Sequence, residues 1–514
     1  VLATVLGGIA SATEILNTAS EFPVVTKPIT LRLFGIRAAI QGDWEKMVYW
    51  TTMEEKTGIH WEFDLVAQDA AAERKSVLLG SGDYPDVFFG ASLNEDELIN
   101  YGTQGVLIPL QDLIAQYMPN LTAFHETYPE YRTLATSADG NIYSLLNVSN
   151  VPRDVASGKL WVNVDWLKAL NLSVPTTLDE YHDVLKAFKE GDPNGNGQAD
   201  EIPLAFTKNT INEYRICILP ALGIVTSNGN TSLYIDENDR AQYVFTTDAY
   251  KEYLAFTKKL YEEGLLDPES FTQTDAQMTA KGNQTLIGSF GRLASYLVDT
   301  SDHFSFYQAI PPMTSALNGV QIWNKNTPGN GGVYAVTNLC KYPEAAMRWA
   351  DYFFSFEGGA FRSQGPEGMG WAYDDGSRTL WSKKVPEGFA SSEEYRGTLT
   401  PDCGTGNPGY TPREFLLNLN AAHVLDLEAN VARAYTPYLK DSYPRAKLSA
   451  EAQMEASVLF PDIDKYMKES EARFITGDLS LDKFDEYVGN LKKMGVDRYV
   501  ELYQQAYEAY KALQ

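Results

Sequence analysis

The sequence predicts an α/β protein, on the basis of how strand-like and helix-like segments alternate near its beginning. Residues 28–34 alternate apolar and polar side chains, which is typical of a half-buried strand. Further elements are predicted in close succession, namely a helix over 43–58, a strand over 58–65, a helix over 70–79 and a short buried strand over 86–89. This alternation predicts βαβ units, a mostly parallel sheet and right-handed crossovers.

A second α/β region is predicted from residues 159–162 onward. Its clearest element is a helix over 177–190, because Thr177 and Glu180 form a capping-box pattern and apolar side chains recur every three or four residues. That apolar face comprises Leu178, Tyr181, Val184, Leu185 and Phe188. Residues 311–332 are rich in Pro, Gly and Asn and are expected to form a loop or a crossing. About the last eighty residues are expected to be helical.

The charge of the chain excludes several classes of partner. Its 514 residues include 42 Lys plus Arg and 68 Asp plus Glu, which gives a formal net charge of −26. A nucleic-acid-binding protein needs a basic face, so we expect no nucleic-acid partner. The same charge disfavours docking on anionic lipid. With 44% apolar residues the composition is that of an ordinary globular protein, and we expect it to work as a monomer.

The beginning of the chain has a composition of its own. Residues 1–12 are small and apolar and end in Ala10-Ser11-Ala12, which is similar to the end of a signal peptide; the alternative is a short helix packed on the body of the protein. Residues 1–27 are therefore expected to form a separate N-terminal segment. No run of residues is long and apolar enough to predict a membrane span. The cysteines have neither metal-binding nor redox spacing, and a disulfide is neither required nor excluded: Cys217, Cys340 and Cys403.

Residues 192–201 carry the sharpest local pattern. Oxygen-bearing side chains occupy every second position with glycines between them, so a tight loop would direct the oxygens toward one point. Calcium prefers six to eight oxygen ligands, and Gly197 permits the sharp turn. An EF-hand loop ends in Glu at its twelfth position, which is Pro203 here, so Glu201 is expected to supply the bidentate carboxylate. A strand over 202–206 is expected to follow.

We therefore predict a structural calcium ion, Ca²⁺, rather than a catalytic one, because a single loop supplies all the ligands and leaves little room for a substrate. The alternative is a Gly/Asn turn capped by its own side chains. The expected ligands are Asp192, Asn194, Asn196, Gln198 through its backbone carbonyl, Asp200 and Glu201.

Several segments together resemble the extracellular solute-binding proteins of ABC importers, specifically the large lipoprotein subgroup that binds oligosaccharides (the LplA type). The resemblance is most specific over residues 160–167, 175–180 and 192–204. Shorter matches lie at residues 82–87, 139–143, 342–346, 351–352, 357–358 and 474–477. The family often has Arg where this chain has Asn163, and this departure favours a neutral rather than an acidic sugar.

The resemblance implies a two-lobe fold like that of type II periplasmic binding proteins, with hinged α/β lobes, a ligand cleft between them and an extra helical C-terminal region. Lobe 1 is expected to comprise residues 28–149 and about 312–375, and lobe 2 residues 150–311 and about 376–514. The calcium loop and the C-terminal helices would belong to lobe 2. An extracellular location is implied, at the bacterial cell surface or in the periplasm, with attachment to the membrane only through a lipid anchor upstream of this sequence.

Candidate ligand-binding residues follow from the chemistry of a sugar. Aromatic rings cover its apolar C–H faces, and planar polar groups bind its hydroxyls. In α/β lobes the ligand is expected at the carboxyl ends of the strands. Rings in loops and polar groups beside predicted strands are therefore the candidates, each with an ordinary structural or surface role as the alternative. They are Trp371, Glu367, Trp323, Asn324, Asn326, Arg37, Asp43, Asp83, Tyr84, Asn147 and Arg292.

The favoured hypothesis is a binding protein, not an enzyme, that captures an oligosaccharide and delivers it to the permease subunits of an ABC transporter. A secreted polysaccharide-degrading enzyme is an alternative that also fits the size, acidity and aromatic content. It would require two carboxylates facing each other across a cleft. A third hypothesis is a non-transporting surface carbohydrate-binding or sensor protein, which the sequence does not separate from the first.

Overall fold

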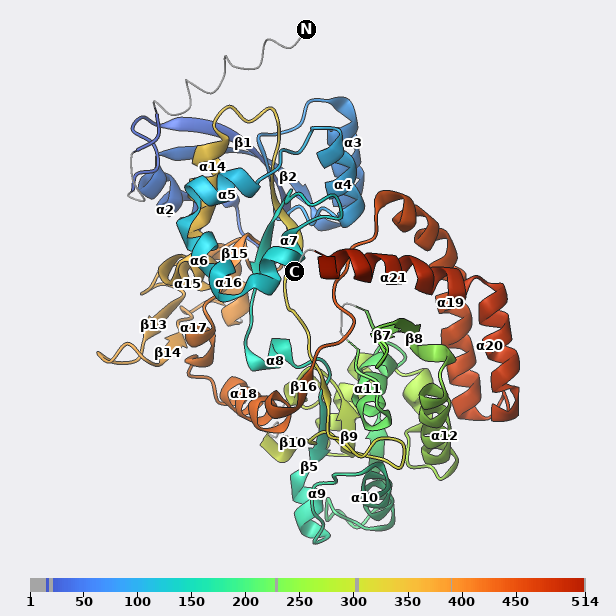
Figure 1. The fold of residues 1–514 in the computed structure, drawn as a ribbon. Helices are drawn as coiled ribbons and strands as arrows, with labels where there is room; N and C mark the ends of the chain where they lie inside the picture. The colour runs from blue at the N-terminus through green and yellow to red at the C-terminus, as the bar shows by residue number, and fades with distance from the viewer. Residues whose placement is uncertain (1–14, 18–21, 227–229, 301–304, 390, 513–514) are drawn as a thin grey trace. The chain divides into compact units, whose positions relative to one another are not determined.

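The computed structural model of the protein describes residues 15–17, 22–226, 230–300, 305–389 and 391–512. Within it, the chain divides into two compact units (Figure 1). Unit 1 comprises the residues up to Asn150 together with Thr327–Asn420, and unit 2 comprises Val151–Asn326 and Ala421–Ala512. Residues 1–12, with their predicted signal-like pattern, lie outside the described residues.

Unit 1 is built on a six-stranded sheet with the strand order β15-β4-β12-β3-β1-β2. All its strands run in one direction except β12, which is antiparallel to both β3 and β4. The strands are β1 (Ile29–Arg37), β2 (Ile59–Ala67), β3 (Val87–Phe89), β4 (Leu145–Val148), β12 (Asn330–Val336) and β15 (Gly409–Tyr410). The predicted α/β fold and the parallel pairing of the first three strands are confirmed.

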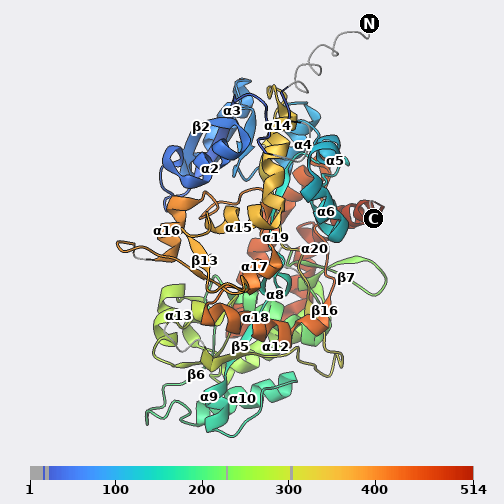
Figure 2. The ribbon, with the colours of Figure 1, turned by 90° about the vertical axis from the view of Figure 1, so that its left-hand side faces the viewer.

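Helices cover both faces of this sheet (Figure 2). Alternation along β3 separates two cores, because Val87 and Phe89 belong to one apolar cluster and Phe88 to the other. On the first face, Trp50 of α2 stacks on Trp349 of α14 with ring centroids 5.8 Å apart. The helices of unit 1 are α2 (Val48–Thr57), α3 (Ala71–Ser81), α4 (Glu95–Thr103), α5 (Gln111–Tyr117), α6 (Pro119–Thr127), α7 (Pro129–Ala135), α14 (Pro343–Asp351), α15 (Phe356–Gln364), α16 (Ser392–Leu399) and α17 (Arg413–Leu417).

Unit 2 contains a four-stranded sheet with the order β10-β5-β9-β6. Only β6 and β9 pair in parallel, so this sheet is mixed rather than mostly parallel. Its strands are β5 (Leu160–Asn163), β6 (Ile202–Ala205), β9 (Ile287–Gly291) and β10 (Tyr307–Ala309). The helices are α8 (Pro152–Val155), α9 (Val164–Ala169), α10 (Leu178–Glu190), α11 (Ile211–Ile218), α12 (Asp248–Glu262), α13 (Asp275–Gly282), α18 (Ala422–Ala434), α19 (Ala450–Thr476), α20 (Phe484–Lys493) and α21 (Val496–Ala512).

Helix α10 forms where the sequence predicts it. All five residues of the predicted apolar face are buried. The Thr177 hydroxyl accepts a hydrogen bond from the Glu180 backbone N–H at 3.1 Å, as an N-cap does. The Glu180 carboxylate accepts from the backbone of Thr176 rather than from Thr177, so the reciprocal half of the capping box is displaced by one residue. The helical C-terminal region is also confirmed, as α19, α20 and α21.

The boundaries of the units differ from the expected ones. Residues 312–326 belong to unit 2, because β11 (Trp323–Asn324) pairs with β16 (Leu439–Lys440). Residues 376–420 belong to unit 1, because β14 (Trp381–Lys383) pairs with β13 (Trp371–Tyr373) and β15 extends the six-stranded sheet. The remaining pair, β7 (Leu233–Ile235) and β8 (Ala241–Tyr243), forms a hairpin in unit 2.

Cys217, Cys340 and Cys403 are free thiols, and all three are buried. Burial raises the pKa of the Cys340 thiol to about 12. Among the described residues, no helix combines the length and the apolarity that a membrane crossing requires.

A buried ion pair joins α11 to the C-terminal helices of unit 2. Arg215 donates from Nη1 to both carboxylate oxygens of Glu471, at 2.9 and 2.7 Å. Only 4% and 2% of the two side chains are exposed, and the guanidinium carbon lies 4.8 Å from the ring centre of Phe245. Removing one partner of such a pair leaves the other charge buried without compensation.

We therefore expect Glu471→Leu to lower the free energy of unfolding of unit 2 by about 3–5 kcal/mol, as measured by urea denaturation. The double variant Arg215→Met/Glu471→Leu should recover most of this loss, because no charge then stays buried. Glu455→Leu is the matched control on the same helix, since Glu455 pairs with Arg498 at the surface. Equal losses in the two single variants would contradict a special contribution from the buried pair.

Candidate functional site

The carboxyl ends of the parallel strands in unit 1 bring polar groups to one edge of the sheet. Arg37 ends β1 with its side chain exposed. Just after it, Gln41 is buried, and its Nε2 donates to the backbone carbonyls of Pro401 at 2.6 Å and Cys403 at 2.9 Å. The amide of Gln41 thus fastens the loop at 401–405 to the end of β1.

The second support of this edge is Arg362 of α15, whose side chain is 2% exposed. Its Nη1 donates to Oδ1 of Asn147 at 2.9 Å and to Oδ1 of Asp402 at 2.8 Å. Its Nη2 donates to the hydroxyl of Thr411 at 2.5 Å. The predicted residue Asn147 therefore lies at the expected edge, and the guanidinium fixes its orientation. The sequence reasoning missed Gln41 and Arg362, because their partners lie far along the chain.

Unit 2 has a corresponding edge around Arg292, which directly follows β9. Arg292 donates from Nη1 to Glu213 at 3.1 Å, and its Nη2 lies 3.6 Å from Asp275. A Cβ atom on Gly291 would lie 2.7 Å from Cα of Tyr214, so only glycine lets β9 approach α11 this closely. Burial raises the pKa of Glu213, while the nearby Arg292 charge opposes that rise. The guanidinium is thus held between two carboxylates.

A buried amine lies beside this edge. Lys159 precedes β5 and is 1% exposed, and its Nζ donates to the backbone carbonyl of Arg153. Burial lowers the pKa of Lys159 to about 8. The neighbouring Arg153 pairs with Glu428 of α18. The cations near this edge therefore already have partners in the protein.

The structure places the predicted ring Trp323 and amide Asn324 inside unit 2. Trp323 is 1% exposed and stacks on Tyr435, with ring centroids 4.2 Å apart. Asn324 accepts from the backbone of Thr226 at 2.7 Å and donates to the carbonyl of Ile216 at 2.7 Å. Asn326 is also buried. These side chains fasten β11 to the body of unit 2 and present no face to a ligand.

Two other candidates lie at the wrong edge of the sheet in unit 1. Asp83 and Tyr84 precede β3, and in a parallel arrangement this puts them opposite the carboxyl ends. Asp83 pairs with Arg32 at 3.1 Å, and the Tyr84 hydroxyl donates to Asn338 at 2.8 Å. The exposed Asp43 follows β1 as expected, but it caps a short 3₁₀ helix by accepting from the backbone of Glu45.

Trp371 and Glu367 are brought together on a flank of unit 1, beside α15. Trp371 is 5% exposed, and its indole N–H donates to the carbonyl of Gly365 at 3.0 Å. Glu367 accepts two hydrogen bonds from Arg378, at 3.0 and 2.8 Å. Both residues line a cavity of about 440 Å³.

The loop predicted to bind calcium joins α10 to β6, and its polar side chains hydrogen-bond within the loop, as in the alternative of a self-capped turn. The Asp192 carboxylate accepts from the backbone of Asn196 at 3.1 Å and of Gly197 at 2.9 Å. The Asp200 carboxylate accepts from the side-chain amides of Asn194 and Asn196 at 3.0–3.1 Å. Gly197 has a φ of 74°, so the turn uses the conformation that glycine favours.

Glu201 gives this loop a carboxylate that no cationic side chain is seen to pair with among the described residues. Both of its carboxylate oxygens are shielded from solvent, and in the described part of the chain only the backbone N–H groups of Glu201 and Asn194 lie near enough to ease its charge. Burial raises its pKa, and the nearby charges of Asp200 and Asp192 add to the rise. Among the described residues, no group of three or more His, Cys, Asp and Glu side chains could hold a metal. A cation here would therefore need the amide and backbone oxygens of the loop as well.

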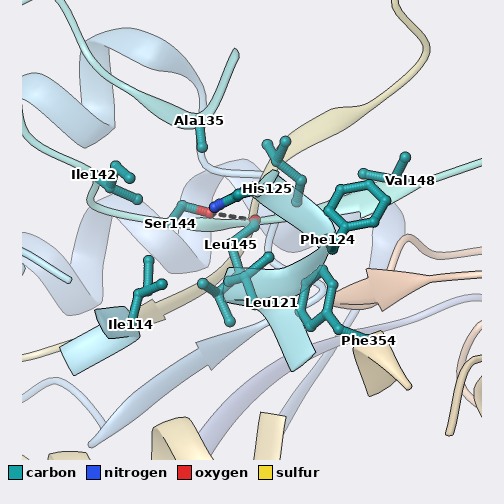
Figure 3. Close-up of a pocket in the computed structure, with 11 residues that line it drawn as sticks. Ile114, Leu121, Phe124, His125, Ala135, Ile142, Ser144, Leu145, Val148 and Phe354 are labelled. Carbon is teal, nitrogen blue, oxygen red and sulfur yellow. Dashed lines mark hydrogen bonds between the residues drawn. The ribbon is translucent and has the colours of Figure 1, made fainter. Parts of the chain in front are cut away.

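A small cavity in unit 1 is lined mostly by apolar side chains, with His125 and Ser144 as its polar members (Figure 3). Its volume of about 10 Å³ is room for roughly one water molecule, so it does not fit a sugar. The Ser144 hydroxyl donates to the carbonyl of Leu145 at 2.9 Å. Burial lowers the pKa of His125 to about 4, and the charge of Arg132 adds to the effect.

Comparison with known proteins gives consistent matches along the chain. A family model described as bacterial extracellular solute-binding protein matches residues 37–360. The fructooligosaccharide ABC transporter substrate-binding protein FusA of Streptococcus pneumoniae is 28% identical over 481 residues, which cover 90% of this chain and 86% of that protein. Its solved structure in complex with kestose has a TM-score of 0.73 at 25% identity, covering 95% of this chain and 100% of the other.

Two further solved structures extend these matches. A FusA EF-hand mutant in complex with fructo-nystose has a TM-score of 0.73 at 25% identity, with 95% of this chain and 100% of that chain covered. An HMO-binding, ABC-transporter-associated solute-binding protein of Bifidobacterium longum infantis has a TM-score of 0.82 at 22% identity, with 94% and 99% coverage. The likeness to the Bifidobacterium protein shows the fold alone.

The lowered pKa of His125 predicts a pH dependence of stability. The unfolded chain binds this proton near pH 6.5 and the folded chain only near pH 4, so stability is lost as the pH falls through this window. Between pH 7 and pH 4, we expect the free energy of unfolding to fall by about 1–3 kcal/mol less in His125→Asn than in the wild type. Denaturation curves of both proteins across this range measure it. Stability curves that stay parallel at every pH would contradict the prediction.

Proposed function

Because the chain belongs to the family of bacterial extracellular solute-binding proteins, we propose that it captures an oligosaccharide outside the cell and delivers it to the permease of an ABC importer. The observation that carries the proposal is the similarity to FusA along 90% of this chain, together with the shared fold. The two α/β units, each with a polar edge at its strand ends, support it further. Lipid attachment and the monomeric state stay predictions.

The proposed ligand is a neutral saccharide. Glu213 and Asp275 already compensate Arg292, and Lys159 is buried, so unit 2 offers an acidic sugar little attraction. The net charge of −26 acts in the same direction. The argument from Asn163 is weaker than the sequence suggested, because Asn163 is buried and caps α9 by accepting from Asp165 and Trp166. The asparagine at position 163 is therefore explained by its role as a helix cap.

In the proposed mechanism the saccharide binds the polar carboxyl edges of the sheets. Contacts that form in only one conformation shift the population toward that conformation, and the permease would recognise it. Arg292 would donate to sugar hydroxyls while its two carboxylates hold the fork in place. No chemical step is involved, so the saccharide is released unaltered.

Isothermal titration calorimetry with neutral oligosaccharides, beginning with kestose, tests this function. We expect saturable binding, with Arg292→Ala raising the Kd at least about tenfold, because the variant loses a fork of donors and leaves Glu213 without its partner. Val458→Ala is the control, since this side chain of α19 is 76% exposed and distant in sequence from the edge. Absence of binding to every saccharide in the panel would contradict the proposal.

The same samples separate a binding protein from a polysaccharide-degrading enzyme. After prolonged incubation, a reducing-end assay should detect no new sugar ends, and the bound saccharide should be recovered intact. Appearance of cleaved products in proportion to protein concentration would favour the enzyme instead. A sensor that does not transport would bind equally well but would fail to restore uptake in cells that carry the permease.

We also propose that the loop 192–201 holds a structural Ca²⁺ through Asp192, Asn194, Asn196, Gln198, Asp200 and Glu201. The support is the clustering of Asp192, Asn196 and Asp200 in one hydrogen-bonded turn, above all with the shielded carboxylate of Glu201 beside them. The description of a FusA EF-hand mutant agrees with such a loop in a relative. Bound calcium would supply the positive charge that the clustered oxygens lack.

Removal of calcium by a chelator is expected to lower the Tm by several degrees, because a ligand bound only by the folded state stabilises it. In Asp192→Ala the Tm should be low from the start and insensitive to chelator. Asp236→Ala is the matched control, since Asp236 also caps a tight turn by accepting from Asn238 and Arg240. A chelator response that survives in Asp192→Ala would place the ion elsewhere.

A further inference from the structure

The flank of unit 1 carries a cavity of ligand size. Its volume of about 440 Å³ lies within the range of small-molecule sites, roughly 300–1,000 Å³. Its walls come from α2, from α15 with the preceding 3₁₀ turn, from the loop at 365–367 and from the strand β13. We call it the flank pocket, and it is lined by Thr52, Lys56, Tyr352, Phe356, Glu357, Ala360, Phe361, Gly365, Pro366, Glu367, Trp371, Tyr373 and Arg378.

The flank pocket is distinct from the polar edge of the same unit. Helix α2 leads from the carboxyl end of β1 to the amino end of β2, and Lys56 lies in its last turn. Arg37 and Gln41 precede the other end of that helix. None of the residues named at the carboxyl edge lines the pocket. A ligand in the flank pocket would therefore not occupy the edge site.

Two ion pairs, each supported by an aromatic ring, line the pocket. Lys56 lies 3.4 Å from Glu357 and 4.5 Å from the ring centre of Tyr352, whose hydroxyl donates to the same carboxylate at 2.8 Å. Arg378 binds Glu367 through two hydrogen bonds and lies 4.3 Å from the ring centre of Tyr373. Each charged group is therefore oriented before any ligand arrives.

These pairs set the charge of the pocket to zero. Lys56 and Arg378 carry two positive charges, and Glu357 and Glu367 carry two negative charges. The hydrogen bond from Tyr352 holds the pKa of Glu357 below its usual value, which keeps this acceptor ionised. An anionic or cationic ligand would have to displace one member of a pair. An uncharged ligand can instead use the spare lone pairs and N–H groups of both pairs.

The pocket also offers an aromatic surface. Phe356 is 47% exposed, which is unusual for so large an apolar side chain. Its ring meets Phe415 edge-on, with centroids 6.3 Å apart. Trp371 forms part of the floor. An exposed ring beside oriented polar groups suits a molecule with one apolar face and a rim of hydroxyls.

We propose that the flank pocket is a second saccharide site, which binds an uncharged sugar of one or two rings against Phe356 and between the Lys56–Glu357 and Arg378–Glu367 pairs. The inference goes beyond transport and does not require a ligand at the carboxyl edges. Affinity is expected in the millimolar range, because the pocket is small and partly open.

The test observes Trp371 directly. In ¹⁵N-labelled full-length protein, the indole resonance of Trp371 is assigned by Trp371→Phe and followed while sucrose is added up to about 50 mM. We expect a saturable shift in the wild type and an apparent Kd at least about fivefold higher in Phe356→Ala. Leu380→Ala, which replaces another exposed apolar side chain near β14, should behave as the wild type. Sodium glucuronate, a charged sugar, should bind at least about fivefold more weakly than sucrose.

Three results would overturn the proposal. They are the absence of any shift with sucrose, an equal response in Phe356→Ala and the wild type, and tighter binding of glucuronate than of sucrose. The carboxyl-edge variant Arg37→Ala separates this test from that of the main function. If the sucrose-induced shift of the Trp371 indole is lost in Arg37→Ala but kept in Phe356→Ala, the resonance reports sucrose bound at the carboxyl edge. The flank pocket is then not a site. If kestose fails to bind by calorimetry but the sucrose shift persists, only the transport proposal fails.

Discussion

The buried guanidinium of Arg362 is the interaction on which the polar edge of unit 1 depends. It connects α15 with Asn147 on β4 and with Asp402 and Thr411 of the 402–411 segment, so three regions far apart in sequence meet at one side chain. A charge 2% exposed is stable only when its donors are matched by well-placed acceptors. The planar fork therefore fixes which way the edge side chains point. At the edge of unit 2, Glu213 and Asp275 hold the guanidinium of Arg292 in a similar way.

Much of the fold could be predicted because it is encoded locally. The helix 177–190 follows from a cap and a periodic apolar face, and both lie within a few residues of each other. The first two strands and the helix between them follow from alternation and from a glycine that ends the helix at Gly58. The tight turn at 192–201 forms because Asp192 and the backbone N–H groups that it caps lie within five residues of each other.

The rest could not be predicted, since it depends on contacts between distant segments. Trp323 lies in a sequence rich in polar residues, yet the ring of Tyr435 stacks on it. The residues near Trp323 in the sequence do not predict this contact, because Tyr435 lies far along the chain. Asp83 and Tyr84 lie beside a strand, as the sequence indicates, but they precede it, and the amino end of a parallel strand lies at the edge opposite the carboxyl ends. The unit boundaries near 327 and 421 likewise depend on the pairing of β11 with β16.

The buried cysteines have a practical consequence. Cys217 lies in unit 2, while Cys340 and Cys403 lie in unit 1, and each sulfur is reached by a reagent only when its surroundings open. The alkylation rate of each natural thiol would thus measure local opening separately in unit 1 and in unit 2. Because these thiols stay silent in the closed interior, a surface cysteine could carry a fluorescent dye without prior removal of the native ones.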